Sequence, residues 1–576
     1  MHAFAEDLER YLAGEAVNAK ADRRLYLVGK ALRKYRLHAV LAAFLLVVLT
    51  ASWLQIRRER DNARATAQIA HAALETTLGP LIDGLARLPG GLEMRGELLG
   101  DVQAQLDALG PFVASDRSME RLRAAWHQQR GDIARAQGRL AEAETEYLAL
   151  VELARSRVAN DPSLVRKRAL MVGLWKLARV SRDWDTVFLE GKHLADALLR
   201  ATPDDDTIKQ DLGETRIWYA RRLFFDGKHQ QAAEQIDLVL ALAEPFPAPQ
   251  SASDWLEMLG EAYEVDGDIR RELGEGERAI DSLQTSVQIR QQLVSAHPAD
   301  LLYAHGLMLS TMKLGSMKRD GGQADEAQAL LERAVEIGVE LLRSEPAHYP
   351  TRRDLYSAYD RLARFYAYST THRDLERAET ISAIALTLVR ELPEIEGDRA
   401  PWRGTLGMAL KLRGSILFEL DLPEEAYVRL AEARDQLIDD LAGDPVDSIV
   451  MKYLADVYDR LGKTSRKLNE HAEKLDHYYA AHSLRRRLHD RYPQVTDYAL
   501  KLIVSQTKIG EWHFHRSTLE DDQVADGWYG KADVELRYLE ESGVLRGREP
   551  KYQSWRDEID RYRRQLVDRL IRESTD

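Results

Sequence analysis

Apolar residues recur at helical spacing over most of the chain beyond residue 119. In the stretch 327–342 they fall at i, i+3, i+4, i+7, i+8, i+14 and i+15, which places them on one face of an α-helix. These residues are Ala327, Leu330, Leu331, Ala334, Val335, Leu341 and Leu342. Gly321 and Gly322 interrupt the helical pattern before this stretch, and Pro346 stops it afterwards. The pattern predicts a hairpin of two helices.

The hairpin pattern repeats at a long and regular interval. Small residues lie 48, 48, 51, 48 and 48 residues apart, at Gly267, Gly315, Ala363, Gly414, Gly462 and Gly510. In five units a proline follows 31 residues after the small residue, at Pro162, Pro298, Pro346, Pro445 and Pro493. Degenerate units are marked by Val172 with Pro203 and by Ala220 with Gly227 and Ala232. We therefore predict an all-α solenoid of about nine hairpins over residues 119–576, capped by a charged helix from Tyr552 to Arg572.

Within each unit the order of small and bulky residues resembles the tetratricopeptide repeat. The order appears as Gly131, Gly138, Ala143 and Tyr147, as Gly267, Gly274, Ala279 and Leu283, and as Gly414, Asp421, Ala426 and Leu430. The small residues are expected where two helices approach closely, and the bulky residue is expected to fill the space beside them. The period departs from the family, because a tetratricopeptide repeat has about 34 residues. The extra length predicts longer helices in each hairpin.

A second pattern lies near the N-terminus. Residues 37–56 are a nearly uncharged apolar run long enough to cross a bilayer. A buried core helix and a cleaved signal peptide are the alternatives, but no polar face interrupts 39–51 and the leader of 36 residues is long for a signal peptide. Seven basic residues precede the run and four follow it, which predicts a cytoplasmic N-terminus and extracytoplasmic repeats. Residues 57–118 are then expected to form a helical stalk, interrupted at Pro89-Gly90-Gly91.

Composition narrows the classes of function. The chain has 576 residues, a net charge of −13 and no cysteine. An acidic chain is a poor partner for phosphate backbones, so we expect no nucleic-acid binding. The absence of cysteine excludes disulfides and thiolate metal sites.

Few residues are arranged for chemistry. His372-Arg373-Asp374-Leu375 spells the start of a kinase catalytic loop, but Glu379 stands where that loop needs asparagine for magnesium, and we expect Asp374 to favour a helix start instead. The histidines at 471, 477, 482, 513 and 515 lack the spacing that places metal ligands on one helix face. Trp126, Trp175, Trp184 and Trp218 are expected to pack between hairpins. We predict no catalytic, cofactor-binding or metal-binding residue, and the pattern does not single out protein-binding residues.

Residues 4–36 resemble the segment that follows the kinase domain in bacterial membrane-bound serine/threonine kinases. The matching residues are Asp7, Leu8, Arg10, Tyr11, Leu12, Gly14, Glu15 and Val17, and Ala16 stands where that family usually has proline. The resemblance implies a cytoplasmic juxtamembrane tail at 1–36, a transmembrane helix at 37–56 and a repeat domain beyond it. The kinase domain that should precede residue 4 is missing, so this chain would not bind ATP or transfer phosphate.

These observations lead to one expected function and two alternatives. The expected function is that of a non-catalytic, membrane-anchored interaction or sensor module of the bacterial inner membrane, binding a protein or peptide on its repeats. The resemblance further implies a homodimer that relays binding across the membrane. The first alternative is a fragment of an active serine/threonine kinase whose catalytic domain lies upstream of Met1. The second is a freestanding tetratricopeptide scaffold of the cell envelope.

Overall fold

The structure is a computed structural model. It describes residues 2–13 and most of 117–575, except 182, 244–251, 392–403, 469–470, 494, 517, 544 and 546–548. Between these parts it describes positions 17, 50, 53, 55, 57–58, 84–85, 87–88, 90–98 and 100. The chain forms two units, residues 1–81 with 100–123 and residues 82–99 with 124–576. In the first unit α1 (His2–Leu12) is amphipathic.

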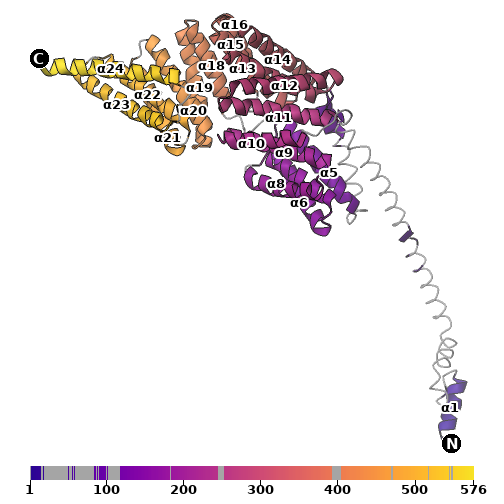
Figure 1. Cartoon of the computed structure of the whole chain (residues 1–576). Coiled ribbons are helices and arrows are strands. Elements are labelled where there is room, and N and C mark those ends of the chain that lie inside the picture. The colour runs from indigo at the N-terminus through magenta and orange to yellow at the C-terminus, as the bar shows by residue number, and fades with distance from the viewer. Residues whose placement is uncertain are drawn as a thin grey trace. The chain divides into compact units, whose positions relative to one another are not determined.

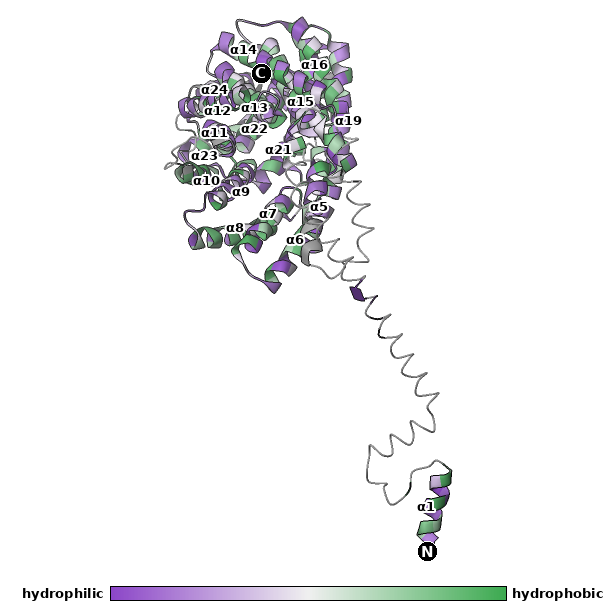
Figure 2. Ribbon diagram, turned by 90° about the vertical axis from the view of Figure 1, so that its right-hand side faces the viewer, coloured by the Kyte–Doolittle hydropathy of each residue, from purple (hydrophilic) through white to green (hydrophobic). Residues whose placement is uncertain are grey.

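Over the described part of residues 117–575, nine helical hairpins follow one another along the chain and a last helix, α24 (Glu549–Thr575), packs on the ninth (Figure 1). The hairpins are α5 (Arg117–Ala136) with α6 (Leu140–Asn160), α7 (Leu164–Ala178) with α8 (Trp184–Ala201), α9 (Asp206–Phe225) with α10 (His229–Ala243), α11 (Ala252–Glu272) with α12 (Gly276–Ala296), α13 (Leu301–Asp320) with α14 (Ala324–Ser344), α15 (Tyr349–Tyr368) with α16 (Leu375–Arg390), α18 (Thr405–Glu419) with α19 (Pro423–Gly443), α20 (Ser448–Lys467) with α21 (His471–Arg491), and α22 (Thr496–Phe514) with α23 (Leu519–Glu541). The predicted all-α array of tetratricopeptide-like hairpins is confirmed. Each helix of the array carries both apolar and polar residues around its axis (Figure 2). The apolar residues pack against the neighbouring helices.

Glycine lets the two helices of a hairpin approach closely. A Cβ placed on Gly267 of α11 would lie 2.5 Å from Cγ of Leu283 on α12. The same relation holds between Gly414 and Leu430, and between Gly131 and the ring of Tyr147. In each case the bulky residue lies 16 positions after the glycine and is buried. The expected pairing of a small and a bulky residue is therefore confirmed.

The turn inside the hairpin requires a left-handed backbone. Gly138, Gly274 and Gly322 each follow the close-packed glycine by seven residues and have φ of 78°, 81° and 78°. Asp421 occupies this position in the α18–α19 hairpin with φ of 63°, which costs free energy for a residue with a Cβ.

Substituting Asp421 with glycine is expected to raise the free energy of unfolding by about 0.5 kcal/mol. Relief of the left-handed strain favours glycine by ~1 kcal/mol. Loss of the exposed ion pair with Lys467, at 2.9 Å, offsets part of that gain. Denaturant titration of both proteins measures the difference, and an unchanged or lower stability would show that the ion pair outweighs the strain.

The repeated prolines mark the boundary between hairpins. Two residues after Pro203, Pro298 and Pro445 stands an aspartate that caps the next helix. The carboxylate of Asp300, for example, accepts hydrogen bonds from the backbone N–H groups of Leu302 and Tyr303 at 2.9 and 3.3 Å. The proline thus ends one hairpin and the aspartate begins the next.

The predicted membrane span at 37–56 lies outside the described residues, apart from Thr50, Trp53 and Gln55. In the ranges that the structure covers, no helix combines the length and the apolar character that crossing a bilayer needs. Those helices carry charged residues, so their apolar side chains form a stripe and not a continuous apolar surface. The predicted localisation, a single-pass inner-membrane protein with extracytoplasmic repeats, is therefore wrong, and the transmembrane part of the predicted fold has no support.

Candidate functional site

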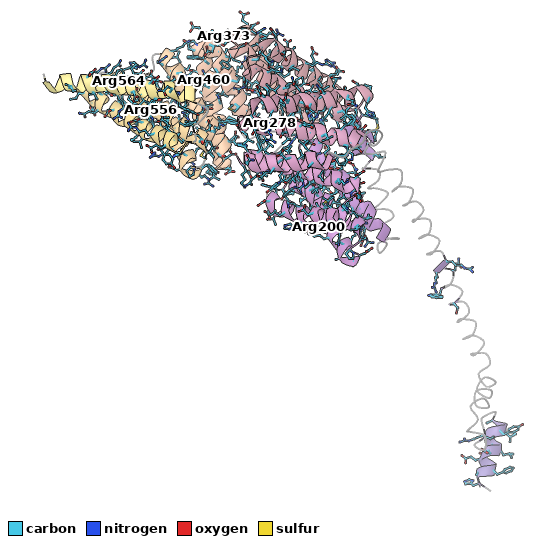
Figure 3. The ribbon with its side chains drawn as sticks, viewed as in Figure 1. Arg200, Arg278, Arg373, Arg460, Arg556 and Arg564 are labelled. Carbon is cyan, nitrogen blue, oxygen red and sulfur yellow. The ribbon has the colours of Figure 1, made fainter. Side chains whose placement is uncertain are left out.

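Ion pairs link the first helices of successive hairpins along one side of the array, which we name the first-helix surface. Each pair joins residues 43 to 49 positions apart, about one repeat. The pairs include Lys176–Asp132 (2.8 Å), Arg168–Asp211 (2.5 Å), Arg221–Glu264 (3.2 Å), Lys313–Glu264 (2.7 Å), His305–Asp354 (2.9 Å), Lys411–Asp456 (3.8 Å) and Lys508–Asp459 (2.6 Å). Arg373 and Arg460, both labelled in Figure 3, reach Glu419 from two different hairpins, at 3.0 and 4.0 Å.

Glu264 of α11 lies at the centre of the strongest cluster. Its side chain is only 1% exposed, and three cations surround it: Lys313 and Arg290 at 2.7 Å and Arg221 at 3.2 Å. Burial alone would raise the pKa of this carboxyl, but Lys313, Arg290 and Arg221 hold it well below its ordinary value. Glu264 is therefore ionised at neutral pH and joins α9, α11, α12 and α13.

Charges on hairpins that are not neighbours also act on one another. Burial lowers the pKa of Arg221, but the carboxylates of Glu261, Glu264 and Asp268 and that of Asp354, three hairpins further on, raise it overall. Burial likewise lowers the pKa of His348, at the start of α15, to about 3, and Arg135 of α5 contributes to this shift. Residues 92 and 95, one helical turn apart, are hydrogen-bonded to Glu345, just before α15, at 3.1 Å and to Gln129 of α5 at 2.8 Å, so the first-helix surface curves inward between α5 and α15.

On this curved surface three carboxyl groups act on one another, and two of them also face a cation: Arg87 lies 3.9 Å from Glu257 and Arg221 lies 3.1 Å from Glu261. Glu214 of α9, with Glu257 and Glu261 of α11, forms what we name the acidic patch. Burial, together with the negative charges of Glu261, Asp211 and Glu257, raises the pKa of Glu214 to about 7. Burial also raises the pKa of Glu257 to about 7, although Arg87 opposes the shift. Glu257 and Glu261 are 39% and 37% exposed, so a cationic group from solution can reach them.

The acidic patch is not among the sites predicted from the sequence. A usable signal is present in α11, where Glu257, Glu261, Glu264 and Asp268 recur at intervals of four, three and four. This spacing places all four carboxyls on one face of the helix. The sequence does not show which of them are neutralised, because Arg221, Lys313 and Arg87 lie in other parts of the chain.

The kinase-like tetrapeptide has a structural role in the repeat. His372 lies in the turn between α15 and α16, and its Nε2 is 2.9 Å from Asp325 on the neighbouring hairpin. The carboxylate of Asp374 accepts a hydrogen bond from the N–H of Arg377 at 2.9 Å and caps α16, as expected.

The other singled-out residues lie apart or in packing positions. His482 contacts Ser505 at 3.1 Å, His513 pairs with Asp521 at 2.7 Å and His515 lies 3.7 Å from Glu511. No group of three His, Asp or Glu side chains within the described ranges could hold a metal ion. Trp184 and Trp218 pack between two hairpins with ring centroids 5.6 Å apart, as predicted.

The chain was compared with family models, with curated proteins and with solved structures. No family model and no curated protein matches it. Among solved structures it is similar to BtubC (BKLC) from P. vanneervenii, with 19% identity and a TM-score of 0.36 over 46% of this chain and 92% of that one. It is also similar to a Rap protein complexed with Competence and Sporulation Factor, with 14% identity and a TM-score of 0.40 over 68% of this chain and 99% of that one. A third similar structure is a human IFIT1 dimer with m7Gppp-AAAA, with 13% identity and a TM-score of 0.40 over 80% of this chain and 87% of that one. Similarity at these TM-scores carries no functional argument for this chain.

The resemblance to membrane-bound serine/threonine kinases is wrong. It required a membrane span between the N-terminal tail and the repeats, and none of the described helices can provide one. No family model supports it either. Of the segment that carried the resemblance, residues 2–12 form α1, in which Phe4, Leu8 and Tyr11 are exposed. A few apolar and basic residues at helical spacing are common to amphipathic helices in general, so the match did not identify a family.

Proposed function

We propose that the chain is a non-catalytic scaffold that binds a basic peptide segment of a partner protein at the acidic patch on its first-helix surface. The observation that carries the proposal is the group formed by Glu214, Glu257 and Glu261, of which Glu257 and Glu261 lie one turn apart on α11 and are 39% and 37% exposed. Burial, and after it the negative charges of the neighbouring carboxyls, raises the pKa of Glu214 and Glu257 to about 7. An arginine or lysine side chain placed among them relieves this repulsion and favours the ionised carboxylates.

The form of the surface supports a peptide as the ligand. The surface curves inward between α5 and α15, and stacked hairpins of this kind present an extended concave face. Exposed carboxyls at the rim of an extended face can recognise basic side chains, while the helices beside them accept the rest of the segment.

The proposal retains part of the function expected from the sequence. The absence of catalysis rests on the lack of catalytic motifs, and the absence of nucleic-acid binding rests on the net charge of −13. The homodimer stays a prediction. The alternative of a kinase fragment depended on the resemblance to membrane-bound kinases and is wrong for the same reason. The proposed function includes no location in the cell envelope.

Replacing both Glu257 and Glu261 with glutamine is expected to weaken binding of basic peptides by at least about tenfold, equivalent to ~1.4 kcal/mol, because charge-assisted contacts are lost. The measurement is fluorescence anisotropy with pairs of labelled peptides that differ only by arginine against glutamate. Glu340→Gln is the matched control, because Glu340 lies on the second helix α14 and is 67% exposed. Equal and measurable binding of the arginine and glutamate peptides to the unmodified chain would refute the proposed site.

A further inference from the structure

A short segment that precedes the array packs against its first-helix surface. Residues 84–98 belong to the same unit as residues 124–576, and of them 84, 85, 87, 88 and 90–98 are described. We name this segment the strap. It makes a turn in which Gly90 has φ of 68°, and it continues as a helix from Gly91. The turn falls where Pro89-Gly90-Gly91 interrupts the helical pattern of the sequence.

Hydrogen bonds tie the strap to hairpins that are far apart in the sequence. The backbone N–H of Leu301 donates to the carbonyl oxygen of Arg87 at 2.9 Å. The N–H of Leu92 donates to Oε2 of Glu345, at the end of α14, at 3.1 Å. Arg95 donates from Nη2 to Oε1 of Gln129 on α5 at 2.8 Å. The strap thus joins α5, α13 and the end of α14, the helices that bound the curved part of the surface.

The strap is packed as well as hydrogen-bonded. Leu92 is 5% exposed and Arg95 is 7% exposed. Arg87 lies with its guanidinium carbon 5.2 Å from the ring centroid of Tyr303. Leu92 is buried at a contact with a residue 253 positions away, and Arg87 contacts Asp300, 213 positions away, which together mark a defined docking position.

Arg87 brings a positive charge to the acidic patch. Its Nη1 donates to Oδ2 of Asp300 at 2.9 Å, and its Nη2 lies 3.9 Å from Glu257. Arg87 therefore occupies the position beside Glu257 that the proposed function assigns to a basic side chain of the partner. A partner arginine that pairs with Glu257 has to take the place of Arg87.

We propose that the strap is a built-in competitor of the acidic patch, and that a partner segment bearing an arginine binds only when Arg87 and the residues around it leave the surface. This inference rests on the proposed function, because the strap competes only if the patch is the binding site. The protein then exists in a closed state, with the strap docked, and an open state that is competent to bind.

Two glycines of the strap offer matched variants. A Cβ on Gly91 would overlap the backbone carbonyl of Leu85, so Gly91→Ala cannot keep the turn that docks the strap. A Cβ on Gly96 would meet nothing within 4 Å, so Gly96→Ala leaves the strap in place. Both substitutions add one methyl group to the same segment and leave the residues of the patch unchanged.

The first measurement is hydrogen–deuterium exchange of the full chain over residues 297–305. Leu301 is the first residue of α13, so its N–H has no acceptor within that helix, and the carbonyl of Arg87 protects it. Exchange at Leu301 is expected to be faster in Gly91→Ala than in the unmodified chain, and unchanged in Gly96→Ala. Equal exchange in all three proteins would overturn the docked state of the strap.

The second measurement uses a labelled synthetic peptide of residues 84–98 as the probe. Gly91→Ala is expected to bind this peptide at least about tenfold more tightly than the unmodified chain and Gly96→Ala do, because its own strap no longer competes. The same peptide with Arg87 replaced by alanine is expected to bind Gly91→Ala at least about tenfold more weakly.

The outcomes separate the competition from the proposed function. Equal affinity of the peptide for all three proteins would overturn the competition and leave the acidic patch as a binding site. No binding to Gly91→Ala, in a protein whose Leu301 exchanges fast, would overturn both the competition and the patch as the binding site. In that case the strap only stabilises the array.

Discussion

Glu264→Gln is expected to lower the free energy of unfolding by about 3 kcal/mol. The substitution keeps the shape of the side chain but removes the charge that Lys313, Arg290 and Arg221 share. Removing one partner of a buried ion pair costs ~3–5 kcal/mol, because the remaining charges stay buried without compensation. The lower end applies here, since Lys313 also pairs with Asp268 and Arg221 with Glu261.

Glu340→Gln serves as the control for this experiment. Glu340 pairs with Arg343, but both side chains are about two-thirds exposed, and such pairs contribute less than ~1 kcal/mol. Denaturant titration of the two variants measures the contrast directly. If Glu264→Gln were as stable as Glu340→Gln, the cluster around Glu264 would not contribute to stability.

The Glu264 cluster also predicts a pH dependence. The pKa of Glu264 is lower in the folded chain than its ordinary value of 4.5, so the unfolded chain binds the proton more readily. The stabilisation is therefore fully present above pH ~5 and is lost as the pH falls through 4.5 and below. The unmodified chain should lose more stability than Glu264→Gln over that interval.

Gly267→Ala is expected to destabilise the α11–α12 hairpin by about 1–3 kcal/mol. Within a helix this substitution ordinarily stabilises by ~0.5–1 kcal/mol, because alanine loses less backbone entropy than glycine on folding. At Gly267 the added Cβ would lie 2.5 Å from Cγ of Leu283 and 3.2 Å from the carbonyl oxygen of Ala279. The helices have to move apart, which costs more than the entropy gain.

Gly527→Ala is the matched control for the close approach. Gly527 lies within α23, and a Cβ there would meet no atom within 4 Å. The two substitutions should therefore change stability in opposite directions. Hydrogen exchange of the affected hairpins measures each effect locally, as an array of hairpins requires. A gain at both positions would show that the helices of α11–α12 can separate without cost.

The repeat was predictable because its determinants are local. Gly267, Gly274, Ala279 and Leu283 lie within 17 residues of one another, and their spacing reports a single hairpin. Asp300, two residues after Pro298, could also have been recognised as a cap from its residue type alone. Where spacing within one hairpin sets the structure, sequence reasoning suffices.

The candidate site was less accessible from the sequence. Whether Glu257 is neutralised depends on Arg87, 170 positions earlier in the chain, and Glu264 depends on Lys313, one hairpin later. Short-range periodicity contains no information on such pairs. The prediction at the N-terminus is wrong for a related reason, because a short match at 7–17 and an apolar run at 37–56 do not define a family.

The ion pairs along the first-helix surface also have a mechanical consequence. Inside a hairpin the helices are joined by apolar contacts such as Gly267 against Leu283, which added salt does not weaken. Between hairpins the partly exposed pairs, such as Arg168 with Asp211, are screened as the ionic strength rises. A rise in ionic strength is therefore expected to loosen the first-helix side between hairpins, while the apolar contacts that also join neighbouring hairpins, such as Trp184 against Trp218, persist.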